Sequence, residues 1–332
     1  MNARVSTQLS GDGFANALIS GIHRVIDDQE ILNKINVFPV PDGDTGTNLS
    51  LSLGAALPVL QQADEKHLGT LLAAVADALL DGARGNSGAI MAQFFQGMSD
   101  SAGDLSRFTP YTFAKAVSMG NDYAHDAMSN PREGTILSVT AAFAASVANG
   151  AAHDADGGFA ELLGNALQQS KQALAETQEQ LEVLRKAGVV DAGAAGFVQF
   201  LDGILHYTLH GHVDQKIPDP NEFELEHAEE QMAGEVHDLD FRFCTECIVT
   251  GNDIDRRHLR EELSQLGSSL VLAGTNRKAK IHIHVNDPRR VFDLAANYGV
   301  VSATKADDMH QQQEITHHQV NQAVAVTIDS AA

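Results

Sequence analysis

Residues 36–53 read NVFPVPDGDTGTNLSLSL, a loop with paired acids directly before a run of helical periodicity. The proline and glycine of PDGD favour a tight turn, and the single glycine between Asp42 and Asp44 lets both carboxylates converge. Two converging carboxylates repel each other unless a cation lies between them. An all-oxygen donor set on a turn suits Mg²⁺ or Ca²⁺ better than zinc. The competing interpretation is a simple helix cap, with Asp44 or Thr45 as the N-cap.

Around this loop, residues 13–210 carry a succession of amphipathic patterns. One helical face fits Leu18, Ile22, Val25 and Ile26, and another fits Leu49, Leu53, Ala56, Leu57 and Leu60. Further helices are predicted over residues 66–82, 87–102, 110–128, 134–149, 157–185 and 193–209. Glycine or proline separates them, and no strand pattern intervenes. We therefore predict an all-α domain of about eight helices over residues 1–210.

The pattern changes near residue 239. The predicted strands are FRFCTECIVTG, SSLVLAG, AKIHIHV and VVSATKA, and the predicted helices are IDRRHLREELSQLG and DPRRVFDLAANYG. The resulting order, β-α-β-β-α-β over residues 239–308, is that of a small ferredoxin-like α+β domain. Residues 211–238 are acidic and contain proline, which is typical of a linker, and residues 309–332 are predicted to be a second linker that ends in a strand pattern.

The composition limits the class of partner. The chain has 22 Lys and Arg against 44 Asp and Glu, a net charge of −22, which repels nucleic acid and anionic membranes. We see no signal peptide and no apolar run long enough to cross a bilayer. Two cysteines three residues apart are too few for a disulfide framework. These features together predict a cytoplasmic protein.

Two more glycine-rich helix starts share the character of the acid turn. GARGNSGAIM, residues 82–91, places Asn86 and Ser87 at one start, and VVDAGAAGF, residues 189–197, places Asp191 at another. Free backbone N–H groups at helix starts bind anions, and an anion site beside a metal site indicates a nucleoside triphosphate. Each loop alone is also typical of an ordinary cap. Neither the Walker A nor the Rossmann glycine pattern is present, so the predicted site has another design.

The small domain carries a second candidate metal site. His282 and His284 lie on one face of the strand IHIHV, and in FRFCTECIV the residues Cys244 and Glu246 share a face, whereas Cys247 points the other way. Cys247 is therefore predicted to be a core thiol and not half of a zinc knuckle. One cysteine and two histidines from neighbouring strands suit zinc, although a histidine pair alone is commonly an exposed polar face. The fourth ligand stays open between Glu246, water and another chain.

Four motifs of the helical region carry a family resemblance: NVFPVPDGDTGTNLSLSL, GARGNSGAI, REGTILSV and AGVVDAGAAGF. They resemble the nucleotide-binding domain shared by the L subunit of dihydroxyacetone kinase and the ATP-binding subunit of bacterial fatty acid kinase. The form NVFPVPDGDTGTN is that of the fatty acid kinase branch, and FRFCTECIV and KIHIHVNDP resemble the middle domain of that ATP-binding protein. The resemblance implies a barrel of eight antiparallel helices that holds ATP and two Mg²⁺ at one end.

The resemblance also implies roles for single residues. Asp42 and Asp44 would bind Mg²⁺ as the catalytic pair, and because a third family aspartate is replaced by Val37, Asn36 becomes the candidate third ligand. The nucleotide would be lined by Thr45, Thr47, Asn48, Asn86, Ser87, Gly134, Thr135 and Asp191. Zinc would be bound by Cys244, His282 and His284, in a structural role because this domain differs from that of the nucleotide.

The implied reaction moves the γ-phosphoryl group of ATP to a fatty acid carboxylate and gives an acyl phosphate. The tail VAVTIDSAA resembles the first strand of DegV-type fatty-acid-binding proteins, which makes a DegV-type protein or fused domain the expected partner. The oligomeric state stays open, a homodimer included. Two alternatives also stay open: a kinase subunit for a dihydroxyacetone-like sugar, and a regulatory module that binds nucleotide without turnover.

Overall fold

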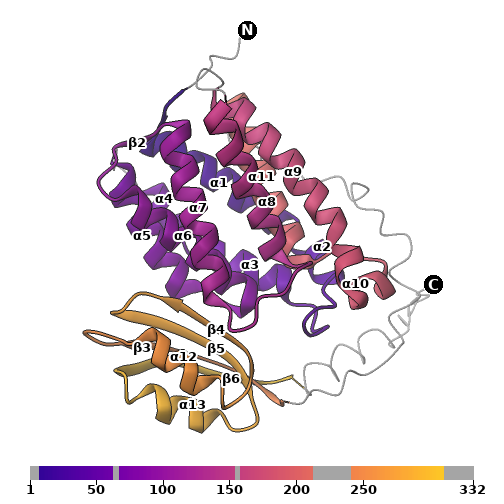
Figure 1. Cartoon of the computed structure of the whole chain (residues 1–332). Coiled ribbons are helices and arrows are strands. Elements are labelled where there is room, and N and C mark those ends of the chain that lie inside the picture. Colours follow the sequence, from indigo (N-terminus) through magenta and orange to yellow (C-terminus); the bar gives the residue numbers. More distant parts are fainter. Residues whose placement is uncertain (1–6, 63–66, 154–157, 212–240, 310–332) are drawn as a thin grey trace, which may run out of the picture.

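The fold is described from a computed structural model, over residues 7–62, 67–153, 158–211 and 241–309. A helical domain comes first, and a small sheet domain packs against one end of its helices (Figure 1). The predicted linker, from residue 212 to residue 238, and the predicted tail, from residue 310 onward, lie outside the described residues.

The helical domain is held together by long helices. Its elements are α1 (Gly11–Asp27), α2 (Gln29–Lys34), α3 (Thr45–Gly54), α4 (Leu57–Gln61), α5 (Leu68–Gly82), α6 (Gly85–Ala102), α7 (Pro110–Ala127), α8 (Ile136–His153), α9 (Phe159–Gln180), α10 (Glu182–Ala187) and α11 (Ala192–His210). Helix α1 packs on α11, α11 on α9 and α8, and α8 on α7; α6 and α5 follow, and α3 and α5 return to α1. Alternating Leu, Ala and Phe faces form the core, in which Phe94 and Phe197 meet edge to face.

Four details of the predicted helices were wrong. The pattern from Leu49 to Leu60 is split between α3 and α4, because the chain turns after Gly54 and Pro58 lies in the first turn of α4. The helix predicted over 157–185 ends at Gln180, where Leu181 is extended. Ile26 lies outside the buried face of α1. The strands β1 (Leu9–Ser10) and β2 (Arg107–Phe108), which pair antiparallel, interrupt the all-α prediction.

The small domain contains β3 (Phe243–Thr250), α12 (Arg256–Leu263), β4 (Ser268–Gly274), β5 (Lys278–Val285), α13 (Pro288–Ala295) and β6 (Val300–Asp308). The strands form an antiparallel sheet in the order β4-β5-β3-β6. One face packs on the two helices, and there Cys247 is fully buried among apolar side chains. Burial raises the pKa of its thiol to about 12, so the prediction of an unreactive core thiol is confirmed.

The other face of the sheet meets the helical domain. Val271 and Ala273 of β4 belong to the same buried apolar cluster as the helices. At the edge of the contact, the Nζ of Lys278 lies 3.0 Å from an oxygen of Asp77 and 2.5 Å from one of Asp81. The two domains are thus in direct apolar and ionic contact, and the sheet covers one end of the helical domain (Figure 1).

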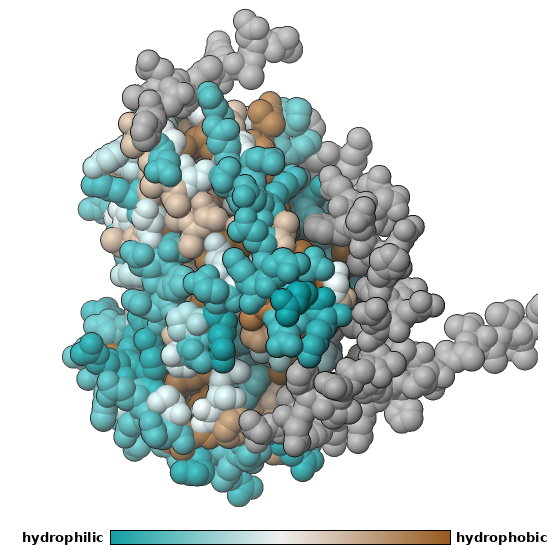
Figure 2. Space-filling model, turned by 45° about the vertical axis from the view of Figure 1, so that its right-hand side comes forward, coloured by the Kyte–Doolittle hydropathy of each residue, from teal (hydrophilic) through white to brown (hydrophobic). Residues whose placement is uncertain are grey.

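The surface is predominantly polar on the side seen in Figure 2, where hydrophobic residues form only small, separate patches. Among the described helices, none is both long and apolar enough to cross a membrane.

Candidate functional site

A cavity of about 340 Å³ lies where the helical domain meets the sheet. Four helices, α3, α6, α8 and α11, begin at one wall, which we call the helical wall; its residues include Asp42, Asp44, Thr45, Asn48, Gly85, Asn86, Ser87, Thr135, Ile136, Asp191 and Gly193. The facing sheet wall includes Cys244, Glu246, His282, His284, Lys305 and Asp307. Because helix starts carry free N–H groups and a partial positive charge, the helical wall is suited to bind a polyanion.

The acid turn is arranged for a cation. Asp44 occupies the N-cap position of α3, yet its side chain makes no capping hydrogen bond. Burial, together with the charge and hydrogen bond of Asp44, raises the pKa of Asp42 to about 8. Two carboxylates that share one place hold a proton in this way until a cation replaces it. These observations favour the cation-site interpretation of PDGD over the simple cap.

Asn36 holds this turn in place. Its Oδ1 accepts hydrogen bonds from the backbone N–H of Thr45, at 2.9 Å, and from the Thr45 hydroxyl, while its Nδ2 donates to the carbonyl of Val40 at 2.9 Å. Both acceptor sites of the amide oxygen are therefore used. Asn36 leaves no free oxygen for Mg²⁺, and the expectation that it is the third ligand gives way to a role in fixing Thr45.

Six of the eight predicted nucleotide residues line the cavity: Thr45, Asn48, Asn86, Ser87, Thr135 and Asp191. The other two do not. The Oγ1 of Thr47 accepts a hydrogen bond from Asn33 at 3.0 Å, which ties α3 to α2. The N–H of Gly134 donates to the hydroxyl of Ser138 at 3.0 Å, and Gly134 has a φ of +80° at the turn before α8. Both residues shape the loops without facing the cavity.

Glycines bring the helix starts close together. Gly85 begins α6 with a φ of +58°, and a Cβ there would lie 2.9 Å from the Nδ2 of Asn48 in α3. A Cβ on Gly193, in the first turn of α11, would lie 2.6 Å from the hydroxyl of Ser87. The motifs GARGNSG and VVDAGAAG therefore serve close approach as well as turning. Beside them, the Oδ1 of Asn86 is buried without a hydrogen-bond partner, as expected of a group that awaits a ligand.

Asp191 is the third acid of the helical wall. It caps α11, where its Oδ1 accepts a hydrogen bond from the N–H of Ala194 at 2.8 Å. Its own N–H donates to the hydroxyl of Thr177 at 3.1 Å. The side chain is only 5% exposed, and burial raises its pKa to about 6. This wall thus combines three acids with the positive ends of helices.

On the sheet wall, three metal-binding side chains converge. The ligand atoms of Cys244, His282 and His284 all lie within 4.8 Å of one another, and Cys244 stands directly opposite His284 in the β3–β5 pair. The Nε2 of His282 is buried without a partner. Burial and the neighbouring charge of His282 lower the pKa of His284 to about 3, which leaves its imidazole neutral. One sulfur and two imidazole nitrogens fit zinc, and three protein ligands facing a cavity leave a fourth position open.

The predicted structural role of this zinc rested on a wrong premise. Residues of two different domains were expected to lie apart, but the Cys244, His282 and His284 triad and the acid turn line one cavity. The sequence could not show this, because the contact depends on how the sheet docks on the helices.

Glu246 lies beside the triad and is held as an anion. Its Oε1 is 3.0 Å from the Nδ1 of His282, and its Oε2 is 3.4 Å from the Nζ of Lys280. Burial opposes the charge, but His282, Lys280 and a backbone N–H from Gly85 outweigh it and lower the pKa of Glu246 to about 2.

Sequence reasoning missed part of the sheet wall. Lys305 and Asp307 of β6 form an ion pair at the cavity and stand opposite Glu246 and Cys244 in the register. The signal was present, because alternate residues of the predicted strand share the face of the adjacent strand. Met309, predicted to be in a linker, is buried in the cavity wall.

The comparisons with known proteins divide the chain in the same way. Residues 39–206 match the DAK2 domain, and residues 240–316 match the FakA-like middle domain of fatty acid kinases. The Bacillus subtilis protein YloV is 34% identical over 312 residues, which cover 92% of this chain and 56% of YloV. An uncharacterised Staphylococcus haemolyticus protein is 30% identical, over 98% of this chain and 61% of its own length.

The chain thus spans a little over half the length of these relatives. Among solved structures, dihydroxyacetone kinase from C. freundii in complex with AMP-PNP and Mg²⁺ matches with a TM-score of 0.45 and 18% identity. That match covers 62% of this chain and 36% of the kinase.

Proposed function

Because this chain belongs to the DAK2 domain family, we propose that it binds Mg²⁺–ATP and transfers the γ-phosphoryl group to the carboxylate of a fatty acid. The observation that carries the proposal is the single cavity in which the acid turn and four helix starts face the Cys244, His282 and His284 triad. The match of residues 240–316 to the fatty acid kinase middle domain supports a carboxylate acceptor in preference to a sugar.

The helical wall would bind the nucleotide. Asp42 and Asp44 converge at the start of α3 and would hold Mg²⁺ against the phosphates. The N–H groups at the starts of α3 and α6, with the side chains of Asn48 and Ser87, would contact the phosphate oxygens. Asn86 would use its unpaired Oδ1 toward the ligand.

The reaction needs no general base. A carboxylate is already ionised near neutral pH, so one of its oxygens can bond directly to the γ-phosphorus. The bond from that phosphorus to the β–γ bridging oxygen breaks, and ADP leaves with the electron pair. No proton moves. The task of the protein is to neutralise charge and align the groups, which matches a cavity built from helix starts and metal-binding side chains.

The sheet wall would meet the acceptor. Cys244, His282 and His284 would hold zinc, which would supply a Lewis-acidic charge next to the site of transfer. Lys305 would add a second positive charge on the same wall, where it is now paired with Asp307. Both features suit an anionic acceptor that must approach an anionic donor.

The size of the cavity supports delivery of the acceptor by a partner. A volume of about 340 Å³ is at the small end for ligand pockets and leaves little room for a long acyl chain beside a nucleotide. A DegV-type protein or fused domain would hold the chain and present only its carboxylate. An ATP-dependent reaction of this kind is expected in the cytoplasm.

The test mixes this protein with Mg²⁺, ATP and a DegV-type protein loaded with fatty acid, and traps acyl phosphate with hydroxylamine. We expect acyl hydroxamate with the loaded partner, and none with free fatty acid alone or with the Asp44→Asn variant. Transfer to dihydroxyacetone alone would contradict the proposal in favour of a sugar kinase. Mg²⁺–ATP binding without transfer to any acceptor would indicate a regulatory module instead.

A further inference from the structure

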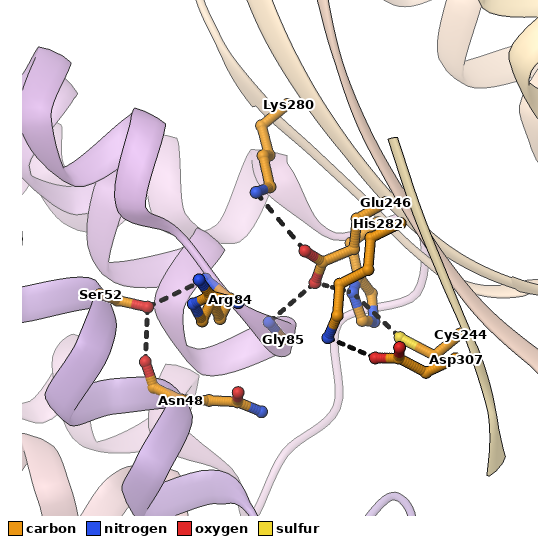
Figure 3. A network of polar contacts seen from close by, with 10 residues as sticks. Asn48, Ser52, Arg84, Gly85, Cys244, Glu246, Lys280, His282 and Asp307 are labelled. Carbon is orange, nitrogen blue, oxygen red and sulfur yellow. Dashed lines mark hydrogen bonds and ion pairs between the residues drawn. The ribbon is translucent and has the colours of Figure 1, made fainter. Parts of the chain in front are cut away.

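One carboxylate joins the two walls of the cavity. Glu246, only 5% exposed, accepts a hydrogen bond at its Oε1 from the backbone N–H of Gly85, at 3.1 Å. The same Oε1 lies 3.0 Å from the Nδ1 of His282, a member of the metal-binding triad. Figure 3 shows Glu246 between the start of α6 on one side and His282 on the other. A single oxygen thus contacts both the nucleotide side and the metal side.

On the helical side, the contact continues into the element that carries the acids. The N–H of Arg84 donates to the hydroxyl of Ser52 at 2.9 Å, and that hydroxyl donates to the carbonyl of Asn48 at 2.6 Å. Both Asn48 and Ser52 lie in α3, which begins directly after Asp44 (Figure 3). A ligand that fixes the acid turn and the starts of α3 and α6 therefore also fixes the N–H to which Glu246 binds.

On the sheet side, Glu246 orients a metal ligand. It stands opposite His282 in the β3–β5 register, and the Nδ1 of His282 lies 3.8 Å from the sulfur of Cys244. Lys280 holds the second oxygen of Glu246 at 3.4 Å, which limits how the carboxylate can turn. Carboxylates that hold a metal-binding histidine set its orientation, and their loss typically costs about 10–100-fold in metal affinity.

We propose that Glu246 is a positioning residue that couples the two ligand sites, so that Mg²⁺–nucleotide on the helical wall and zinc on the sheet wall bind more tightly together than alone. The proposal rests on the two ligands of the proposed function. A nucleotide that orders the start of α6 orders Glu246, and Glu246 in turn orders His282. Because binding free energies are linked, zinc must strengthen nucleotide binding by the same factor.

The domain contact by itself does not explain such coupling. Lys278 also crosses between the domains, but its partners Asp77 and Asp81 lie in α5 and do not line the cavity. It provides a matched control, because Lys278→Met loosens the contact without touching either ligand group.

The experiment measures the zinc affinity of the whole chain by competition with a zinc chelator, with Mg²⁺ at one concentration throughout and with or without saturating AMP-PNP. In the wild-type protein we expect AMP-PNP to tighten zinc binding about fivefold or more. The reverse titration, AMP-PNP with and without zinc, should give the same factor.

The deciding variant is Glu246→Asp. It keeps the negative charge, and hence the field in the cavity, but is one methylene too short to contact both Gly85 and His282. We expect its coupling factor to fall to near one, whereas Lys278→Met keeps the wild-type factor. Glu246→Gln, which keeps the length and loses the charge, serves as a second variant, and the melting temperature of each protein without ligands establishes that it is folded.

The inference fails alone if both ligands bind the wild-type protein but neither changes the affinity of the other. Wild-type coupling in both folded Glu246 variants would also overturn it, because the coupling would then run by another route. If AMP-PNP does not bind even without zinc, the proposed function fails, and the separate nucleotide titration identifies that result.

Discussion

The two walls of the cavity solve the problem of charge in different ways. On the sheet wall, acids and bases neutralise each other: Glu246 lies between His282 and Lys280, and Asp307 pairs with Lys305. On the helical wall, the acids are Asp42, Asp44 and Asp191, and within the described residues none of them has an ion pair with a cationic side chain.

This difference shows which wall depends on a cation. The sheet wall is neutral through its own side chains and is organised before any ligand arrives. The helical wall balances its acids only through burial, protonation and backbone N–H groups, as the raised pKa values of Asp42 and Asp191 show. We therefore expect changes at the acid turn to affect function more strongly than changes on the sheet wall.

The largest effect is expected from Asp44→Asn. An amide keeps the size of the side chain but removes the charge that holds Mg²⁺ where phosphoryl charge must be neutralised. Phosphoryl transfer should fall by about a thousandfold or more, measured as turnover of Mg²⁺–ATP with a loaded partner. Asp104→Asn, which changes an exposed acid that does not line the cavity, is the control and should be nearly silent. Comparable turnover in the two variants would remove Asp44 from the site.

On the sheet wall, Cys244→Ser should eliminate bound zinc. We expect one zinc per chain in metal-replete wild-type protein and none measurable in the variant, by elemental analysis. The small domain should also melt earlier than the helical domain, because bound zinc contributes folding energy.

Cys247→Ala is the matched control for this change. Cys247 is buried on the opposite face of the same strand, so its loss should lower stability slightly and leave zinc in place. Equal zinc content in the Cys244→Ser variant and the wild type would contradict the assignment of the triad.

The sheet wall was largely predictable because strands have a period of two. From alternation alone, Cys244, His282 and His284 were predicted to share a face and Cys247 to face the core, and the register places them so. Lys305 and Asp307 obeyed the same rule and could have been found with it.

The helical wall was predictable in its motifs but not in its details. Glycine-rich loops indicated which helix starts would converge, yet nothing local separates Thr45, which faces the cavity, from Thr47, which bonds to Asn33. The engagement of Asn36 depends on a loop that returns to Thr45. The docking of the sheet depends on contacts between residues far apart in the chain, such as Lys278 with Asp77, which no local pattern encodes.

A smaller effect, on stability and with a defined sign, is expected for Asp191→Asn. The folded-state pKa of about 6 lies roughly two units above the unfolded value of 3.8, so the folded protein binds this proton more tightly. Ionisation therefore destabilises the fold as the pH rises through about 4 to 6, by at most about 3 kcal/mol. Asn can still cap α11, so the variant should be more stable by about 1–3 kcal/mol at pH 7.5 and by less than about 1 kcal/mol at pH 4.

Urea unfolding of both proteins at the two pH values, without ligands, measures this difference. A variant that is less stable than the wild type at pH 7.5 would show that the carboxylate is needed by the fold and not by a ligand.

The smallest effect is expected for Lys305→Met, which tests whether the neutral sheet wall can lend its charge to a substrate. Lys305 is half-exposed and paired with Asp307, so its release for an anionic acceptor breaks only one ion pair in partial contact with water. We expect kcat/KM for the acceptor to fall by about tenfold, well below the roughly hundredfold or more typical of a buried donor, while the affinity for Mg²⁺–AMP-PNP stays within about twofold. Lys186→Met, which removes an exposed lysine paired with Glu182 outside the cavity, is the control. An equal loss of nucleotide affinity would place Lys305 on the phosphates of ATP, and no loss of either would show that the two walls keep their charges to themselves.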